Sequence, residues 1–109
     1  MQLGALKLDW VSAGDFMLDG GAMFGPVPRP MWEKKIAPDA KNRIPLGTNC
    51  ILVETDYGRV LMDCGLGNKI AEKQAAILDY GAQDQLQTNL AARGLTPADI
   101  DHVVMSHCD

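Results

Sequence analysis

The first part of the chain alternates apolar and polar residues in two short runs. Over residues 5–12, Leu6, Leu8 and Trp10 alternate with charged residues. Side chains at alternate positions of a strand point to the same face, so this run predicts a half-buried β-strand. A second, short apolar stretch at residues 16–18 ends in Asp19 and a pair of glycines, which permit backbone angles closed to other residues.

Residues 25–45 have a different character. Five prolines lie among charged and amide side chains in this segment: Pro26, Pro28, Pro30, Pro38 and Pro45. Proline lacks a backbone N–H and fixes φ, so regular structure should not persist here beyond one helical turn at residues 32–35. A loop of this length inside a compact domain is usually either functional or disordered.

The next segment is strongly β-forming. Residues 46–55 and 59–63 are rich in Ile, Leu, Val and Met, and the sequence Asp-Tyr-Gly at residues 56–58 separates them. A short connection with glycine, which tolerates positive φ, predicts a β-hairpin. The second strand continues into a glycine-containing loop at residues 63–67.

The remaining residues predict two helices, a helical turn and a strand. Apolar residues recur at helical spacing over residues 70–80 and 85–93, and Gly94 provides a stop for the second helix. Thr96 followed by proline fits the start of a short helix. Residues 100–105 predict a strand that delivers Ser106, His107, Cys108 and Asp109.

Composition and charge exclude several classes of function. The net charge is −4 and the basic residues are scattered, which argues against a nucleic-acid partner. No apolar run reaches the roughly 18 residues needed for a membrane span, and the N-terminus has no secretory pattern, so a cytoplasmic protein without a membrane partner is expected. Three widely spaced cysteines fit neither a disulfide framework nor a structural zinc site. Cys50 and Cys64 are expected to be small buried thiols.

The chemistry-bearing residues lie at the end of the last strand. His107 and Asp109 are alternate residues, and an imidazole with a carboxylate suits zinc, iron or manganese. A His-x-Asp pair also arises by chance as a solvated terminus. The Gly65-x-Gly67 loop lacks the further residues of a dinucleotide or phosphate-binding fingerprint.

Three ordered blocks resemble the metallo-β-lactamase-fold hydrolases. Residues 95–107 (Leu-Thr-Pro-Ala-Asp-Ile-Asp-His-Val-Val-Met-Ser-His) resemble the helix and strand that lead into the His-x-His-x-Asp-His motif of that family. Residues 49–55 and 60–67 resemble its N-terminal hairpin and Asp-x-Gly loop. Residues 19–25 resemble lactonase-type members, which include the acyl-homoserine-lactone hydrolases. This resemblance suggests that the loop at residues 25–45 lines the substrate entrance, with Met31 and Trp32 in contact with an acyl chain. Simple packing of the loop against the sheet is the alternative. The resemblance extends from about residue 8 to residue 109.

The resemblance implies a fold and a set of site residues. The fold would be the αββα sandwich, an α/β architecture. Residues 1–109 would supply the N-terminal half of a single domain that is truncated within the metal motif. His107 would be the first metal ligand, Asp109 would occupy the position of the second histidine, and Asp63 would orient ligands by hydrogen bonds or serve only as a turn-former. One or two divalent metal ions are implied, with zinc as the first choice and iron or manganese as alternatives.

The resemblance also implies an activity. The full-length protein would be a hydrolase in which a metal-activated water attacks an ester or lactone-type carbonyl of a small-molecule substrate. The 109 residues alone would be inactive. Two alternatives stay open: a flavodiiron-like di-iron oxidoreductase, which the acidic residue at position 109 favours, and a non-catalytic fragment of the fold.

Overall fold

A computed structural model describes residues 1–81 and 85–107 of the chain. Its elements in chain order are β1 (Gln2–Leu3), β2 (Leu6–Asp19), α1 (Gly20–Phe24), α2 (Arg29–Trp32), β3 (Arg43–Thr55), β4 (Gly58–Met62), α3 (Glu72–Leu78), α4 (Gln85–Ala91), the 3₁₀ turn η1 (Pro97–Asp99) and β5 (His102–Val104). Within these described ranges, no helix has the length and apolar character to cross a bilayer.

The chain divides into two compact units. Unit 1 comprises Met1–Gly14, Gly47–Lys69 and Ala82–Asp109, and unit 2 comprises Asp15–Leu46 and Ile70–Gly81. The long strands β2 and β3 each run from one unit into the other. The strand ends that carry the polar residues of the metal motif belong to unit 1.

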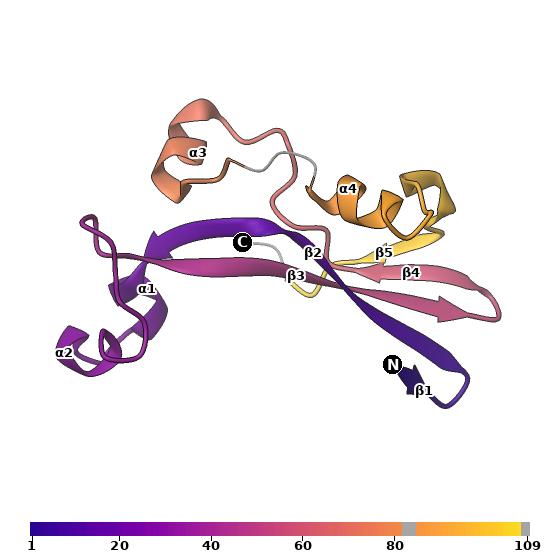
Figure 1. Ribbon diagram of the computed structural model, residues 1–109, viewed down its shortest axis with the longest axis horizontal. Helices are drawn as coiled ribbons and strands as arrows, with labels where there is room; N and C mark the ends of the chain where they lie inside the picture. The colour runs from indigo at the N-terminus through magenta and orange to yellow at the C-terminus, as the bar shows by residue number, and fades with distance from the viewer. Residues whose placement is uncertain (82–84, 108–109) are drawn as a thin grey trace. The chain divides into compact units, whose positions relative to one another are not determined.

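The strands form one sheet in the order β1-β2-β3-β4-β5. Strands β3 and β4 pair antiparallel from Ile51↔Met62 to Thr55↔Gly58, with only Asp56 and Tyr57 between them. This arrangement confirms the hairpin predicted from the sequence. Strand β5 joins β4 in parallel, with Met62 opposite Val104. Figure 1 shows β4 between β3 and β5.

The strand predicted at residues 5–12 is part of a longer strand that also includes the apolar stretch at residues 16–18. Strand β2 is continuous over 14 residues. Gly14 adopts a φ of 121°, a value that glycine tolerates and that lets the strand continue where the apolar alternation changes phase. The side chains facing the core are those of Val11 and Ala13, whereas Trp10 is exposed.

The proline-rich segment contains more regular structure than predicted. Asp19 caps α1 by accepting a hydrogen bond from the N–H of Ala22 (2.9 Å), and α2 ends at Trp32 instead of beginning there. Strand β3 begins at Arg43, so Pro45 lies inside it, near its start. The Trp32 ring is buried and stacks on Phe24 at 5.1 Å between ring centroids. Trp32 therefore packs inside unit 2, while Met31 is exposed.

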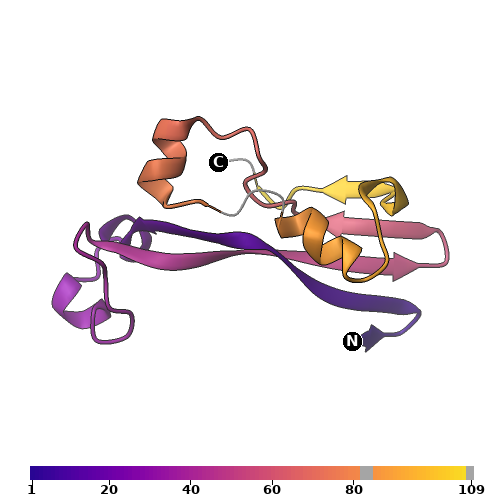
Figure 2. The ribbon, with the colours of Figure 1, turned by 45° about the horizontal axis from the view of Figure 1, so that its top comes forward.

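The core of unit 1 lies between the sheet and α4. Val11, Ala13, Cys50, Leu52, Leu61 and Leu90 form one buried cluster. Two side chains fasten α4 and the turn after it to β2: Asn89 donates to the Ser12 carbonyl (2.9 Å), and Arg93 donates to Asp9 (2.7 Å) and to the Trp10 carbonyl (2.7 Å). Figures 1 and 2 show α4 lying across one face of the strands of unit 1.

Apolar side chains also lie exposed on the strands of unit 1. Ile51 and Met62 are cross-strand partners, and Met62 is in turn the partner of Val104. Cross-strand partners point to the same face, so the three side chains form a row. Each is at least 40% exposed, as is Trp10 on β2. Ile51 and Met62 alternate with the core residues Leu52 and Leu61, which places the row on the face opposite α4.

Candidate metal centre

The parallel pairing of β4 and β5 brings two distant parts of the chain together. Asp63 directly follows β4, and Ser106 and His107 follow β5 after one intervening residue. The backbone N–H of Asp63 donates to the carbonyl of Val104 at 2.8 Å. The C-terminal ends of two neighbouring strands therefore deliver polar side chains to one edge of the sheet, where α/β folds commonly build their sites.

Asp63 adopts a left-handed backbone conformation with a φ of 61°. This region is unfavourable for residues with a side chain, although aspartate is among those that enter it most readily. Hydrogen bonds hold the side chain in place: Oδ1 accepts from the backbone N–H of Ser106 at 2.7 Å, and Oδ2 accepts from the Ser106 hydroxyl at 2.8 Å. Asp63 thus ties the end of β4 to the end of β5.

These hydrogen bonds stabilise the charged form of the carboxylate. The backbone N–H of Ser106 is the largest cause that lowers the pKa of Asp63, followed by the Ser106 hydroxyl and by the charge of His107, while desolvation opposes them. Asp63 is accordingly ionised at neutral pH. An ionised carboxylate can only accept hydrogen bonds.

His107 continues the same chain of hydrogen bonds. Its Nδ1 lies 2.7 Å from the Ser106 hydroxyl oxygen. Ser106 was not singled out in the sequence. The available signal was a hydroxyl residue placed between an apolar strand and a histidine. The other expected ligand, Asp109, and its neighbour Cys108 lie outside the described residues.

Sulfur atoms and a close backbone contact surround this edge of the sheet. Cys50 is fully buried, and burial is the main cause that raises the pKa of its thiol. A raised pKa disfavours the reactive thiolate, which fits the predicted packing role. Cys64 is partly buried, and its thiol lies 3.6 Å from the Met105 sulfur. Gly65 packs so closely on Ala13 that an added Cβ would lie 2.5 Å from the Ala13 methyl carbon.

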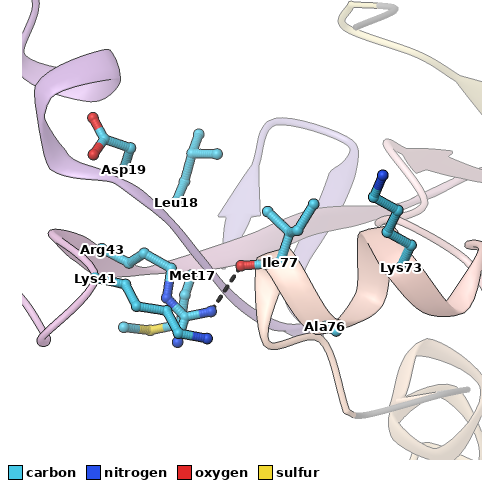
Figure 3. Close-up of a pocket in the computed structure, with 8 residues that line it drawn as sticks. All are labelled: Met17, Leu18, Asp19, Lys41, Arg43, Lys73, Ala76 and Ile77. Carbon is cyan, nitrogen blue, oxygen red and sulfur yellow. Dashed lines mark hydrogen bonds between the residues drawn. The ribbon is translucent and has the colours of Figure 1, made fainter.

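Unit 2 contains a pocket of about 500 Å³, a volume within the usual range for small-molecule sites. Met17, Leu18, Ala76 and Ile77 supply apolar walls, and four charged residues complete the lining: Asp19, Lys41, Arg43 and Lys73. Figure 3 shows Arg43 reaching toward α3, where its guanidinium donates to the Ile77 carbonyl at 2.7 Å.

Basic residues outnumber acidic residues in the lining of this pocket. Arg43 forms an ion pair with Asp39 at 2.8 Å, and Asp19 accepts a hydrogen bond from the Asn42 amide at 2.9 Å. Three of the four charged lining residues are basic, and one of them, Arg43, also forms a longer ion pair with Asp79 at 3.8 Å. Two of the basic residues, Lys41 and Arg43, come from the proline-rich segment, for which lining of a substrate entrance and packing against the sheet were alternative predictions.

Comparison with known families decides the identity of this fold. Residues 43–109, more than half of the chain, match the model of the metallo-beta-lactamase superfamily. The chain belongs to this superfamily. No curated protein gives a significant match. The family resemblance and the α/β fold class predicted from the sequence are both confirmed, and the chain covers only part of the matched structures.

Solved structures of metallo-beta-lactamase relatives agree with this assignment. A probable metal-dependent hydrolase from Staphylococcus aureus is 37% identical over 98% of this chain, with a TM-score of 0.88. AidC, a dizinc quorum-quenching lactonase in complex with its product N-hexanoyl-L-homoserine, is 26% identical over the whole chain, with a TM-score of 0.69. An N-acyl homoserine lactone hydrolase at 20% identity over 89% of this chain supports the fold alone, with a TM-score of 0.58. The chain spans 39%, 35% and 38% of these three proteins.

Hydrolases of the metallo-β-lactamase fold are metal-dependent. The chemistry fits: a histidine at the strand end is held by a hydroxyl and a carboxylate, as the ligands of metal sites usually are. The number of donors is incomplete, because residues 1–81 and 85–107 contain no group of three or more histidine, cysteine or acidic side chains placed to hold a metal. A catalytic zinc site takes three protein ligands.

Proposed function

We propose that residues 1–109 are the N-terminal part of a metal-dependent hydrolase domain that acts on an ester or lactone-type carbonyl of a small molecule. The observation that carries the proposal is the hydrogen-bonded series Asp63–Ser106–His107 at the sheet edge. It occurs in a chain that is 37% identical to a probable metal-dependent hydrolase. A lactone or ester is proposed because a structural neighbour at 26% identity is described as a dizinc quorum-quenching lactonase with the product N-hexanoyl-L-homoserine bound.

Each site residue has a distinct role in this proposal. His107 and Asp109 hold the metal, for which zinc is the first choice and iron or manganese the alternatives. Asp63 orients the His107 ring through the Ser106 hydroxyl and does not bind the metal. When bound, the metal supplies a water of lowered pKa and polarises the carbonyl that the water attacks. The contribution of the described residues is to fix the direction of the His107 ring.

The remaining ligands are proposed to come from a longer polypeptide of which these residues form one part. Two observations support this. The chain spans only 39% of the length of the Staphylococcus aureus hydrolase. In addition, the row formed by Ile51, Met62 and Val104 leaves apolar side chains exposed on a sheet face, a pattern typical of surfaces that another layer covers. The 109 residues alone are therefore expected to be inactive.

The test is a comparison of two histidine variants in the protein expressed with whatever coding sequence follows residue 109. Metal content and hydrolysis of N-hexanoyl-homoserine lactone are measured for His107→Ala and for His102→Ala. His102 is the matched control because it is the only other histidine and is exposed on β5. We expect His107→Ala to lose both bound metal and hydrolysis, and His102→Ala to retain them.

The same assay distinguishes the alternatives. Full metal content and full activity in His107→Ala would overturn the proposed role of this residue. Bound iron with oxygen-reducing activity in place of hydrolysis would favour the di-iron oxidoreductase predicted as an alternative. Absence of metal from both the unaltered protein and the variants would favour the non-catalytic fragment.

A further inference from the structure

Ser106 occupies the centre of the hydrogen-bond series at the sheet edge. Its hydroxyl oxygen lies 2.8 Å from Oδ2 of Asp63 and 2.7 Å from Nδ1 of His107. Its backbone N–H also donates to Oδ1 of the same carboxylate at 2.7 Å. One residue therefore contacts both oxygens of Asp63 and one ring nitrogen of His107.

The hydroxyl has a single proton, so the two contacts must differ in direction. The Asp63 carboxylate is ionised and accepts from both the N–H and the hydroxyl of Ser106. Because the hydroxyl proton is given to Asp63, the Ser106 oxygen can interact with His107 only as an acceptor. The donor in that contact is Nδ1–H, whether the imidazole is neutral or charged.

We propose that Ser106 is a positioning residue that holds neutral His107 in the Nδ1–H tautomer, so that Nε2 carries the lone pair. The proton on one ring nitrogen decides which nitrogen can donate to a metal, and a hydrogen bond at the other nitrogen sets it. The purpose of this tautomer rests on the proposed function. The tautomer itself does not, so it is measured without metal.

The test is a ¹⁵N NMR measurement of the imidazole nitrogens in the metal-free chain. Spectra are recorded at successively more alkaline pH until they no longer change, so that the neutral rings are observed. His102 and His107 are the only histidines, and the exposed His102 serves as an internal reference for the Nε2–H form that free imidazole side chains favour in water. We expect the unaltered chain to show Nδ1–H at His107.

Three variants test which atom donates and which accepts in these hydrogen bonds. Ser106→Ala removes the acceptor, and His107 should revert to the His102 pattern, whereas Ser106→Thr keeps a hydroxyl and should keep Nδ1–H. Asp63→Asn should invert the tautomer, because the amide then donates to the hydroxyl and the hydroxyl proton turns to Nδ1, as an aspartate-to-asparagine change does in a serine protease triad. The matched control is Ser12→Ala, since Ser12 is the only other serine and its hydroxyl contacts Gly14.

Each outcome bears directly on the proposal. An Nε2–H pattern at His107 in the unaltered chain would overturn it, and so would an unchanged Nδ1–H pattern in Ser106→Ala. If Ser106→Ala disturbs the strand, the other two variants still decide, because Asp63→Asn preserves the shape of the side chain and Ser106→Thr preserves the hydroxyl. A correct tautomer pattern in a protein that later proves to bind no metal would leave the role of Ser106 standing and refute only the proposed function.

Discussion

Gly65 and Gly67 form a matched pair that separates backbone strain from crowding. Both have a φ of 70° and lie in the same loop after β4. An added Cβ at Gly65 would lie 2.5 Å from the Cβ of Ala13, whereas one at Gly67 would meet nothing within 4 Å. Carbon atoms in contact are normally roughly 3.5–4.0 Å apart. Substitution of either glycine by alanine therefore adds the same strain, but only the first adds a clash.

The magnitudes follow from these two terms. A left-handed conformation costs about 1–2 kcal/mol for a residue with a Cβ. Crowding in a packed core adds about 1–3 kcal/mol. Gly67→Ala should therefore lower the free energy of unfolding by the first amount, and Gly65→Ala by the sum, about 2–5 kcal/mol. The difference between the two variants measures the contact of Gly65 with Ala13.

Urea unfolding of the chain followed by circular dichroism measures this difference. With a slope of about 1–3 kcal/mol per molar urea, the midpoint of Gly65→Ala should fall below that of Gly67→Ala by at least several tenths molar. The double variant Ala13→Gly/Gly65→Ala should recover part of the loss, because it removes the atom that the new methyl meets. Equal midpoints for the two single variants, or no recovery in the double variant, would refute the close packing of this loop on β2.

Two further predictions concern ion pairs and acid stability. Arg43→Ala should destabilise the chain by about 1–3 kcal/mol, because it removes a largely buried guanidinium that bonds to Asp39 and to the Ile77 carbonyl. Arg29→Ala, which breaks an exposed ion pair with Glu33, should change the urea midpoint little. Similar losses of stability in the two variants would contradict this expectation. The pKa of Asp63 is lowered in the folded chain, so its contribution is fully present above its unfolded pKa of about 3.9 and is lost as the pH falls through the folded value. Urea midpoints measured from neutral to acid pH should therefore fall more steeply for the unaltered chain than for Asp63→Asn, and parallel curves would show that Asp63 is not stabilised in the fold.

The sequence predicted those helices, strands and turns that depend on residues close together in the chain. The hairpin of β3 and β4 follows from two apolar runs and a short connection. The turn η1 follows from Thr96, whose backbone N–H and hydroxyl both donate to the Asp99 carboxylate. The reach of β2 was not predictable in this way, because Gly14 resembles a strand end in sequence but continues the strand through contacts with residues far along the chain, such as Thr48.

The candidate site was only partly predictable for the same reason. His107 and Asp63 were singled out through the family resemblance, and the structure joins them through Ser106. A serine at the end of a strand carries no specific signal by itself. Its position matters because a parallel pairing brings it to a carboxylate 43 residues away, which no local pattern encodes.

The parallel pairing of β4 with β5 also has a consequence for the order of folding. The β3–β4 hairpin closes across two residues, whereas Met62 meets Val104 only after a loop of about 40 residues is closed, at an entropic cost of about 3 kcal/mol that grows with the logarithm of loop length. Pairings distant in sequence form slowly. The hairpin is therefore expected to form early, and His107 to reach Asp63 later, when the loop between β4 and β5 closes. A metal ion that needs His107 in its final orientation would enter a scaffold that is already built, instead of serving as the nucleus around which the chain folds.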